Sequence, residues 1–488
     1  MIIGVEAVVA AYNTAWAGVN AYNFSALLRR GKPSDANAEE LNAFIKENAL
    51  MPKISVLLPA YHEANVLNES VNALCNSNYP KERFEILVLL EHGDTDTINT
   101  AALLSLKYPN VRPILVSSKQ YKNKPNALNH GLYLSVGEIV GVIDAEDIVE
   151  KDLLLKVAYN ISKKGYDVVQ GVLDMANDTD GWKNMMQRAE YSYWFSHLLP
   201  GMEESGMPLP LGGTTNFFKA NLLNSIGGWN PKNLTEDFEL GIRLYNHNLS
   251  EESKREKMAE PEKGKSPIYP YINKYTASFY AQHARDYGQG DIGVTLDTLN
   301  ELKLKDSNKI KSIALIKMIH AITEEESPTS WGAWMRQRVR WQQGKIQTAK
   351  EYAVNMPKTT KGKANTAMAV ITPHIAVLNI TGIAIGVYAF ATNALSLPLS
   401  IFTYFNFASV FVYSIANGIS YASIVKPEGR PNRKLKAAIV AITTPAYWVM
   451  QWVADIKALK REYIDKNGTW DKTEHMGRHF KNKVEMQK

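Results

Sequence analysis

Three clusters of polar residues along the chain have the types and spacing to carry chemistry. The first is Asp144-Ala145-Glu146-Asp147, which directly follows an apolar run. Grouped carboxylates supply the hard oxygen ligands that divalent cations prefer, and such a cation can neutralise a diphosphate leaving group. Acidic residues are equally favoured in the first turn of a helix, so a purely structural role is an alternative.

The second cluster is Thr235-Glu236-Asp237, which follows two glycine-containing segments at 211–216 and 227–229. Glycine lets a backbone approach a ligand closely, and Trp229 in the second segment offers a flat face for a sugar ring. Asp237 could deprotonate an acceptor hydroxyl if it lies within hydrogen-bond reach. The alternative is again a helix start, because the residues after Asp237 have helical character.

The third cluster is Gln337-Arg338-Val339-Arg340-Trp341. Arginine can clamp phosphate oxygens with two hydrogen bonds, and tryptophan can stack on a pyranose ring. A basic helix face at a membrane surface is the alternative interpretation.

The elements that would position these clusters alternate between strands and helices over residues 51–248. Apolar runs without polar alternation predict a mostly parallel sheet that is covered on both faces. Ligands bind such sheets beyond the carboxyl ends of the strands, which is where Asp144 falls. The predicted strands are 53–59, 84–90, 111–116 and 138–143, and the predicted helices are 65–75, 97–107 and 127–135.

Composition narrows the function classes. The net charge of +6 suits a protein that handles anionic phosphates or an acidic membrane surface, and by itself it does not indicate nucleic-acid binding. The single cysteine, Cys75, excludes an intramolecular disulfide, and no Cys/His cluster has zinc-site spacing. Residues 249–310 are interpreted as an insertion, and 331–358 as an amphipathic helix.

Three stretches lack Asp, Glu, Lys and Arg: 7–28, 364–425 and 437–454. The first two are long enough for spanning helices, two of them in 364–425, and the basic pair Arg29-Arg30 predicts a cytoplasmic domain after the first. We therefore expect a multi-pass membrane protein, with 445–463 at the membrane interface. Because the stretches contain many polar residues, buried helices of a soluble or peripheral protein are the alternative.

Taken together and in this order, the motifs resemble those of the processive, cellulose-synthase-like and hyaluronan-synthase-like branch of the family 2 glycosyltransferases. The branch has an acidic residue after the second strand, a DxD, a TED and a Q-x-x-R-W, which appear here as Glu91, 144–146, 235–237 and 337–341. Segments 56–63 and 124–129 also resemble the family. The segment 470–475 is similar to its W-x-K-T-x-H ending.

The resemblance implies an α/β fold of the GT-A type. It also implies three regions: 1–50 with a membrane helix, 51–350 as the catalytic domain with the insertion 249–310, and 351–488 with membrane and interface helices and a possible gating tail. It further implies a role for each motif residue. The implied nucleotide-sugar site comprises Ala60, Tyr61, Glu63, Glu91, Asp94, Lys124, Asp144 and Arg338. The implied catalytic residues are Glu236, Asp237 as the base, Gln337, Arg340 and Trp341, and the implied ligands of Mg2+ or Mn2+ are Asp144, Glu146 and Asp147.

The function implied is an inverting, metal-dependent hexosyltransferase that uses a nucleotide-sugar, with UDP preferred, to elongate a β-linked polysaccharide. One alternative is a non-processive transferase that acts on a lipid acceptor. Another is a degenerate membrane-bound protein that binds nucleotide-sugars, because Glu91 and Glu146 stand where the family usually has aspartate. Partners would be the donor, a polysaccharide or lipid-linked glycan acceptor and the membrane, with no nucleic acid.

Overall fold

The computed structural model describes residues 36–47, 51–116, 122–177, 181–258, 314–354, 360–392, 397–423 and 432–466, with a few single positions elsewhere; at 249–258 and 368–381 it describes the backbone alone. The chain divides into two compact units. We call residues 34–171 and 210–323 the sheet unit. Residues 1–33, 172–209 and 324–488 form the helical unit.

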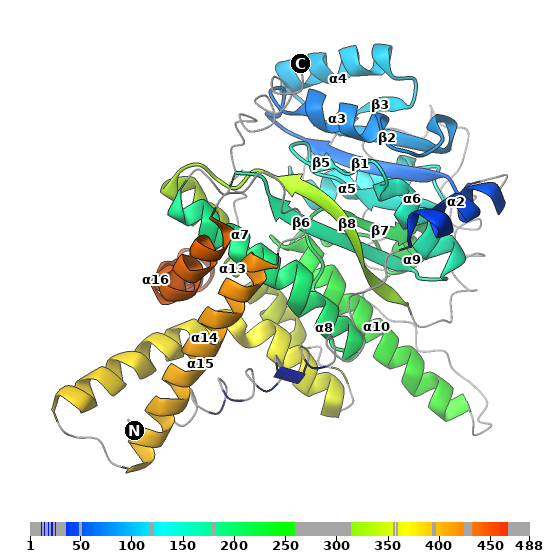
Figure 1. The fold of residues 1–488 in the computed structure, drawn as a ribbon. Helices are drawn as coiled ribbons and strands as arrows, with labels where there is room; N and C mark the ends of the chain where they lie inside the picture. Colours follow the sequence, from blue (N-terminus) through cyan, green and yellow to red (C-terminus); the bar gives the residue numbers. More distant parts are fainter. Residues whose placement is uncertain are drawn as a thin grey trace. The chain divides into compact units, whose positions relative to one another are not determined.

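The sheet unit is built on an eight-stranded mixed sheet with the order β3-β2-β1-β4-β7-β6-β8-β5 (Figure 1). Strands β1 to β4 run parallel to one another, as predicted, whereas β7 is antiparallel to both β4 and β6. The strands are β1 Ile54–Ala60, β2 Phe84–Glu91, β3 Val111–Val116, β4 Ile139–Val142, β5 Ile148–Val149, β6 Val168–Met175, β7 Asn216–Lys219 and β8 Ile316–Glu325. The expectation of a mostly parallel sheet therefore holds only for its first half.

Helices alternate with these strands along the chain. They are α2 Ala38–Glu47, α3 Leu67–Cys75, α4 Thr95–Lys107, α5 Lys124–Leu134, α6 Leu153–Ala158, α9 Ala220–Ser225 and α10 Glu236–Met258. All seven elements predicted between residues 53 and 143 are present, with ends that shift by at most three residues.

Both faces of β1, β2 and β4 are covered, which explains why their sequences are apolar without alternation. Val56 and Leu58 of β1 pack in the core that contains the apolar side of α3. On the other face, Gly131 of α5 lies so close to Leu57 and Leu89 that an added Cβ would stand 2.9 Å from each. The carboxyl ends of β1, β2 and β4 therefore meet at one edge of a rigid sheet.

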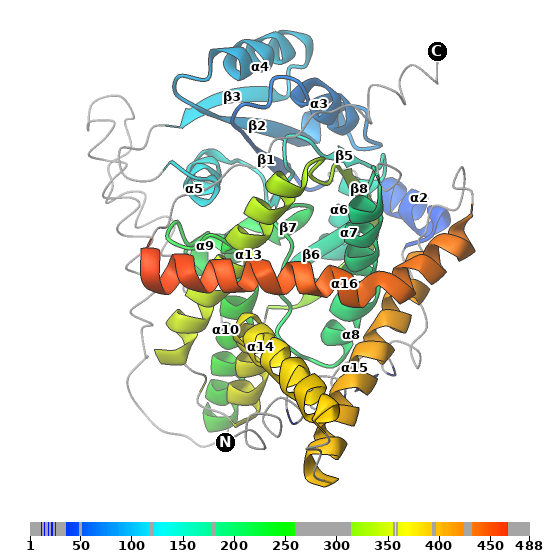
Figure 2. The same cartoon turned by 90° about the vertical axis from the view of Figure 1, so that its left-hand side faces the viewer.

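The helical unit contains α7 Trp182–Tyr193, α8 Leu199–Glu204, α13 Trp331–Val354, α14 Thr360–Ala391, α15 Leu397–Ala422 and α16 Arg433–Lys460. A π-helical turn joins α7 to α8, and another extends α16 to Asp465. In Figure 2, α16 crosses α13 and meets α15, in agreement with its packing contacts.

One helical stretch in the described part of the chain, Arg433–Asp465, is long and apolar enough to cross a membrane, and 22% of its apolar window is buried. The predicted spans in 364–425 are helices, α14 and α15, but their described apolar stretches are shorter, at Gly382–Ala391 and Val410–Ala422. A multi-pass arrangement is therefore not supported by the described residues. Most of the predicted span 7–28 and the whole of 470–475 lie outside them.

Candidate active site

Lys124 begins α5 and reaches into the edge of the sheet where the strands end. Its ammonium donates hydrogen bonds to the carboxylate of Asp144 and, at 2.9 Å, to the carbonyl oxygen of Gly213. Burial alone would lower the pKa of Lys124, but the carboxylates of Asp144, Glu236 and Asp237 raise it above its usual value. The site therefore holds a permanent positive charge among three acidic groups.

The turn after β4 is held by Asp147. This side chain is fully buried, and its Oδ2 accepts hydrogen bonds from the N–H of Asp144 at 3.1 Å and from the Thr214 hydroxyl at 2.5 Å. Asp144 and Glu146, by contrast, are both partly exposed. Of the three predicted metal ligands, Asp147 thus has a structural task in the turn.

Asp144 and Glu146 are the carboxylates that could face a bound cation. In the described residues, no three His, Cys, Asp or Glu side chains are grouped so that they alone could hold a metal ion. A magnesium-like ion is commonly held by one or two carboxylates, with waters and substrate phosphates completing its shell. The donor set fits a cation that binds together with a diphosphate.

Gly213 lies between Lys124 and Asp237. A Cβ added at Gly213 would stand 3.2 Å from Oδ2 of Asp237 and 3.6 Å from Nζ of Lys124. Asp237 is partly exposed in the first turn of α10, whereas Glu236 beside it is 6% exposed. The predicted base therefore lies in the same small region as the predicted diphosphate-binding lysine.

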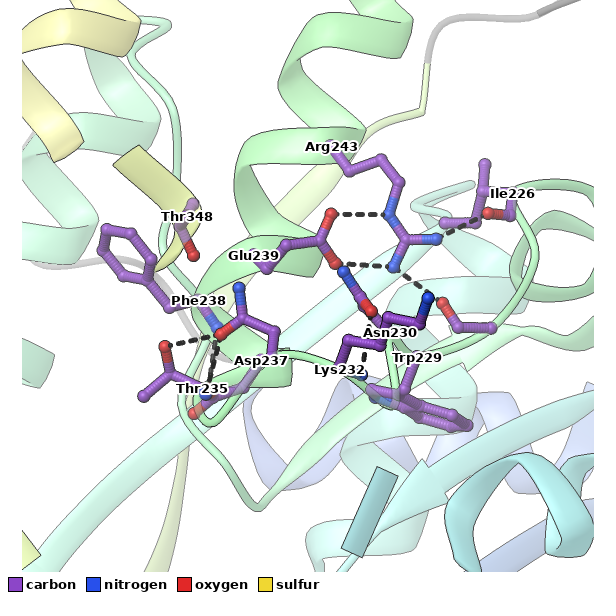
Figure 3. Close-up of polar contacts among 12 residues, drawn as sticks. Ile226, Trp229, Asn230, Lys232, Thr235, Asp237, Phe238, Glu239, Arg243 and Thr348 are labelled. Atoms are coloured by element: carbon purple, nitrogen blue, oxygen red, sulfur yellow. Dashed lines mark hydrogen bonds and ion pairs between the residues drawn. The ribbon is translucent and has the colours of Figure 1, made fainter. Parts of the chain in front are cut away.

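The start of α10 is fixed by a polar network (Figure 3). Arg243 pairs with Glu239 through two hydrogen bonds of 3.0 and 2.9 Å, and it also donates to the carbonyl oxygens of Ile226 and Gly228 at 2.6 and 2.8 Å. One turn earlier, Asn233 accepts from the N–H of Thr235 at 2.9 Å. This network was not predicted from the sequence, although Glu239 and Arg243 stand four apart, the spacing of a helical ion pair.

Trp229 does not offer a sugar-stacking face, so that expectation was wrong. The residue is 2% exposed, and its ring meets the ring of Phe218 edge-on at 6.1 Å. Asn129 of α5 holds the backbone N–H and carbonyl of Trp229 with hydrogen bonds of 2.9 and 2.8 Å. The segment 124–129 thus positions the loop before Asp237 through Asn129 and contacts the candidate site through Lys124.

The carboxyl ends of β1 and β2 bring together the residues predicted to bind the nucleotide. Asp94 is 3% exposed and caps α4; it accepts hydrogen bonds from the N–H groups of His62 at 2.5 Å and Thr97 at 3.3 Å. Burial would raise the pKa of Asp94, but these N–H groups and the Thr97 hydroxyl lower it below its usual value. Burial raises the pKa of Glu91.

Around these two acidic residues, Ala60 and Glu63 are buried, whereas Tyr61 is 46% exposed. The N–H of Glu63 donates to the Thr97 hydroxyl at 3.0 Å. Hydrogen bonds therefore connect the segment after β1 to the start of α4. We call Tyr61, Glu63, Glu91 and Asp94, which lie at this edge of the sheet, the polar rim.

Gln337, Arg338, Arg340 and Trp341 belong to α13 of the helical unit. Arg338 is 4% exposed, pairs with Glu190 at 2.6 Å and lies 4.6 Å from the Trp341 ring centroid. Burial would lower the pKa of Arg338, but Glu190 raises it above its usual value. Its guanidinium is thus engaged inside the unit, while Arg340 and Trp341 are partly exposed.

Part of this chain is similar to known glycosyltransferases. Residues 52–267 match the family model described as glycosyltransferase like family 2. A β-monoglucosyldiacylglycerol synthase of Trichormus variabilis is 30% identical over 197 residues, which are 40% of this chain and 42% of that protein. A probable glucomannan 4-β-mannosyltransferase 7 of Oryza sativa is 26% identical over 200 residues, 39% of this chain and 34% of that protein.

The matched region spans less than half the length of these curated relatives. The solved structure of the mannosyltransferase PcManGT from Pyrobaculum calidifontis, in complex with GDP-Man and Mn2+, matches the fold with a TM-score of 0.55 at 16% identity, over 96% of this chain and 100% of that one. The expected α/β fold is confirmed, whereas the processive branch is not specifically indicated. Residues 52–267 are therefore similar to a family 2 glycosyltransferase domain, and the α/β fold is similar to that of the mannosyltransferase PcManGT.

Proposed function

We propose that the chain is an inverting hexosyltransferase that moves a sugar from a nucleotide-sugar donor to an acceptor hydroxyl. The observation that carries this proposal is the convergence of Lys124, Asp144 and Asp237 around the backbone of Gly213, inside the domain that matches the family. One positive group suited to a diphosphate and one accessible carboxylate are the minimum that a single displacement requires.

In the proposed reaction, Asp237 takes the proton of the acceptor hydroxyl as its oxygen attacks the anomeric carbon. The bond from that carbon to the diphosphate oxygen breaks on the opposite face, and the nucleoside diphosphate leaves with the electron pair. General-base catalysis of this kind contributes roughly 10²- to 10⁴-fold. The Lys124 ammonium stabilises the charge that develops on the leaving group, because its hydrogen bonds to Asp144 and Gly213 already orient it.

Asp144 and Glu146 would hold Mg2+ or Mn2+ against the diphosphate, where the cation supplies further neutralisation of the leaving charge. PcManGT, which has a similar fold, was solved in complex with GDP-Man and Mn2+, and this supports a divalent cation here. Because that donor carries GDP, both GDP and UDP are candidate nucleotides for this chain. At the carboxyl ends of β1 and β2, the rim formed by Tyr61, Glu63, Glu91 and Asp94 would receive the nucleotide.

The acceptor we propose is a growing β-linked glycan, as the glucomannan mannosyltransferase relatives suggest. A lipid acceptor is the second candidate, and two observations favour it. One relative is named for a glucosyldiacylglycerol product. Large apolar side chains are also exposed on three helices of the helical unit: Val387, Tyr388 and Phe390 on α14, Tyr404, Phe411 and Val412 on α15, and Ile442 and Val449 on α16.

These exposed apolar faces also support membrane association of the helical unit, because contiguous apolar surface on helices is typical of lipid or protein contact. A flotation experiment with vesicles tests this part. Chain that floats with vesicles, and stays in the dense fraction without them, supports it; chain that stays dense in both conditions contradicts it.

The activity is tested by nucleotide release from a panel of UDP- and GDP-sugars, with Mn2+ or Mg2+ and with a chelator. We expect release from one donor that depends on the metal, and product formation on either an oligosaccharide or a diacylglycerol acceptor. Nucleotide that binds without release from any donor, with both acceptors present, would instead support a degenerate binding protein.

A further inference from the structure

Gln170 lies in β6, in the interior of the sheet, and its side chain is fully buried. It is in register with Asn216 of β7, next to the loop 212–215 that leads into that strand. Its Oε1 accepts a hydrogen bond from the N–H of Gly212 at 2.9 Å, and its Nε2 donates to the carbonyls of Thr214 at 3.0 Å and Thr215 at 3.2 Å. One amide group thus satisfies the backbone at both ends of the loop.

The loop needs such support because its conformation is strained. Thr215 has a φ of 55°, in the left-handed region that a β-branched residue rarely adopts. The neighbour of Gln170, Gly171, makes room for it: a Cβ there would stand 2.5 Å from Cγ2 of Thr215 and 2.8 Å from the carbonyl oxygen of Ala321. Strain of this kind persists only where the surroundings over-determine the backbone, and it tends to lie at functional sites.

The same loop supplies the groups that organise the candidate site. The carbonyl of Gly213 accepts from Lys124, and the hydroxyl of Thr214 links the N–H of Asp144 to the carboxylate of Asp147. Gln170 touches neither Lys124 nor Asp144, yet it fixes the residues on both sides of Gly213. A shift of the loop would therefore move both the Lys124 ammonium and the turn that contains Asp144 and Asp147.

We propose that Gln170 is the positioning residue of the site: its amide holds the loop 212–215 in the strained form that orients Lys124 and Asp144. The expected effect of Gln170 on catalysis rests on the proposed function, whereas its effect on the orientation of Lys124 does not. The two effects can therefore be tested separately.

The test uses Gln170→Met, which keeps the volume but removes every hydrogen bond, and Gln170→Glu, which keeps the acceptor but loses the N–H donors. Ser55→Ala is the matched control, because Ser55 is also a fully buried polar strand residue, whose hydroxyl bonds to Glu85 and Gly137 away from the site. All proteins are compared well below their melting temperatures.

The first readout is acetylation of Lys124, followed by mass spectrometry of the full chain. Lys156, which is paired with Glu150 in the same unit and has a side chain 15% exposed against 12% for Lys124, serves as the internal reference. Loss of a hydrogen bond from a charged group should speed acetylation of Lys124 about tenfold or more in both Gln170 variants. Lys156 should keep its rate, and so should both lysines in Ser55→Ala.

The second readout is the kinetics of nucleotide release, in which kcat should fall by about 10²-fold with a smaller change in KM. Unchanged acetylation of Lys124 in both Gln170 variants would overturn the positioning role whether or not the wild type turns over a donor. Faster acetylation in a wild type that releases no nucleotide would leave the positioning of Lys124 intact and overturn the proposed function. An unchanged kcat in an active enzyme would overturn the catalytic consequence.

Discussion

The carboxylate of Asp237 borders the backbone of Gly213, so closely that a methyl group at position 213 would stand 3.2 Å from Oδ2 of Asp237. These two residues come from different elements, the loop before β7 and the first turn of α10. The Lys124 ammonium lies beside the same glycine, 3.6 Å from the position of an added Cβ.

Gly213→Ala should therefore impair transfer without unfolding the protein. The added methyl would stand 3.2 Å from Oδ2 of Asp237, so that carboxylate must shift by a few tenths of an ångström, whereas the 3.6 Å separation from Lys124 Nζ is an ordinary contact. Misplacement of a catalytic group by about 1 Å can cost ~10²-fold in rate, so this smaller shift should cost less. We expect kcat to fall by about 3- to 10-fold in a nucleotide-release assay. Gly332→Ala is the control, since its nearest contact would be 3.6 Å and it lies in helix α13. An unchanged kcat in Gly213→Ala would argue against Asp237 as the base.

Lys124→Met should weaken binding of the nucleoside diphosphate. Hydrogen bonds to charged groups contribute about 1.5–3 kcal/mol, so the dissociation constant should rise by about 10- to 100-fold. Isothermal titration with UDP and GDP in the presence of Mn2+ measures it, with the exposed Lys151→Met as the matched control. If both variants bind UDP and GDP as tightly as the wild type does, Lys124 does not contact the diphosphate.

The pair of Arg338 and Glu190 should contribute to the stability of the helical unit. Breaking a buried pair costs about 3–5 kcal/mol, and because the Glu190 side chain is 33% exposed we expect about 2 kcal/mol for Arg338→Met. A double-mutant cycle with Glu190→Gln, measured by urea unfolding, should show coupling between the two positions. Strictly additive effects would show that the pair is not a stabilising unit.

Much of this architecture could be predicted from the sequence, because strands that are covered on both faces read as unbroken apolar runs. The strands from Ile54 to Val142 and the position of Asp144 in the turn after β4 followed from that pattern, and Asp237 lies at the helix start that the sequence offered as an alternative. Strand β7 did not, since Asn216–Lys219 is only four residues long and its antiparallel pairing depends on a partner, β6, distant in the sequence. The sheet is therefore mixed, whereas the sequence predicted a mostly parallel one.

Side-chain roles within a motif were harder to predict than the motif itself. Asp147 and Trp229 have suitable chemistry for a ligand site, yet packing buries both, at 0% and 2% exposure. Gln170 was missed altogether, because a single glutamine in an apolar strand carries no periodic signal. Its role depends on hydrogen bonds to residues more than forty positions away in the sequence.

Asp94 should give the sheet unit a stability that depends on pH. Its pKa is lower in the folded protein than in the unfolded chain, so its contribution is present above the unfolded pKa of about 4 and is lost as the pH falls through the folded value. Asp94→Ala should lower the melting temperature at pH 7, and the difference from the wild type should shrink at pH 3. A difference that is equally large at both pH values would contradict the charged form of Asp94 as the stabilising species.

The role of Asp237 as the base of a glycosyl transfer can be measured through the kcat of Asp237→Asn on the donor and acceptor that the wild type uses. The control is Asp96→Asn, an exposed acidic residue in the first turn of α4. We expect Asp237→Asn to lower kcat by about 10²- to 10⁴-fold while nucleotide affinity and melting temperature stay close to the wild type, and Asp96→Asn to change none of them. A kcat within a factor of about two of the wild type in Asp237→Asn would contradict it.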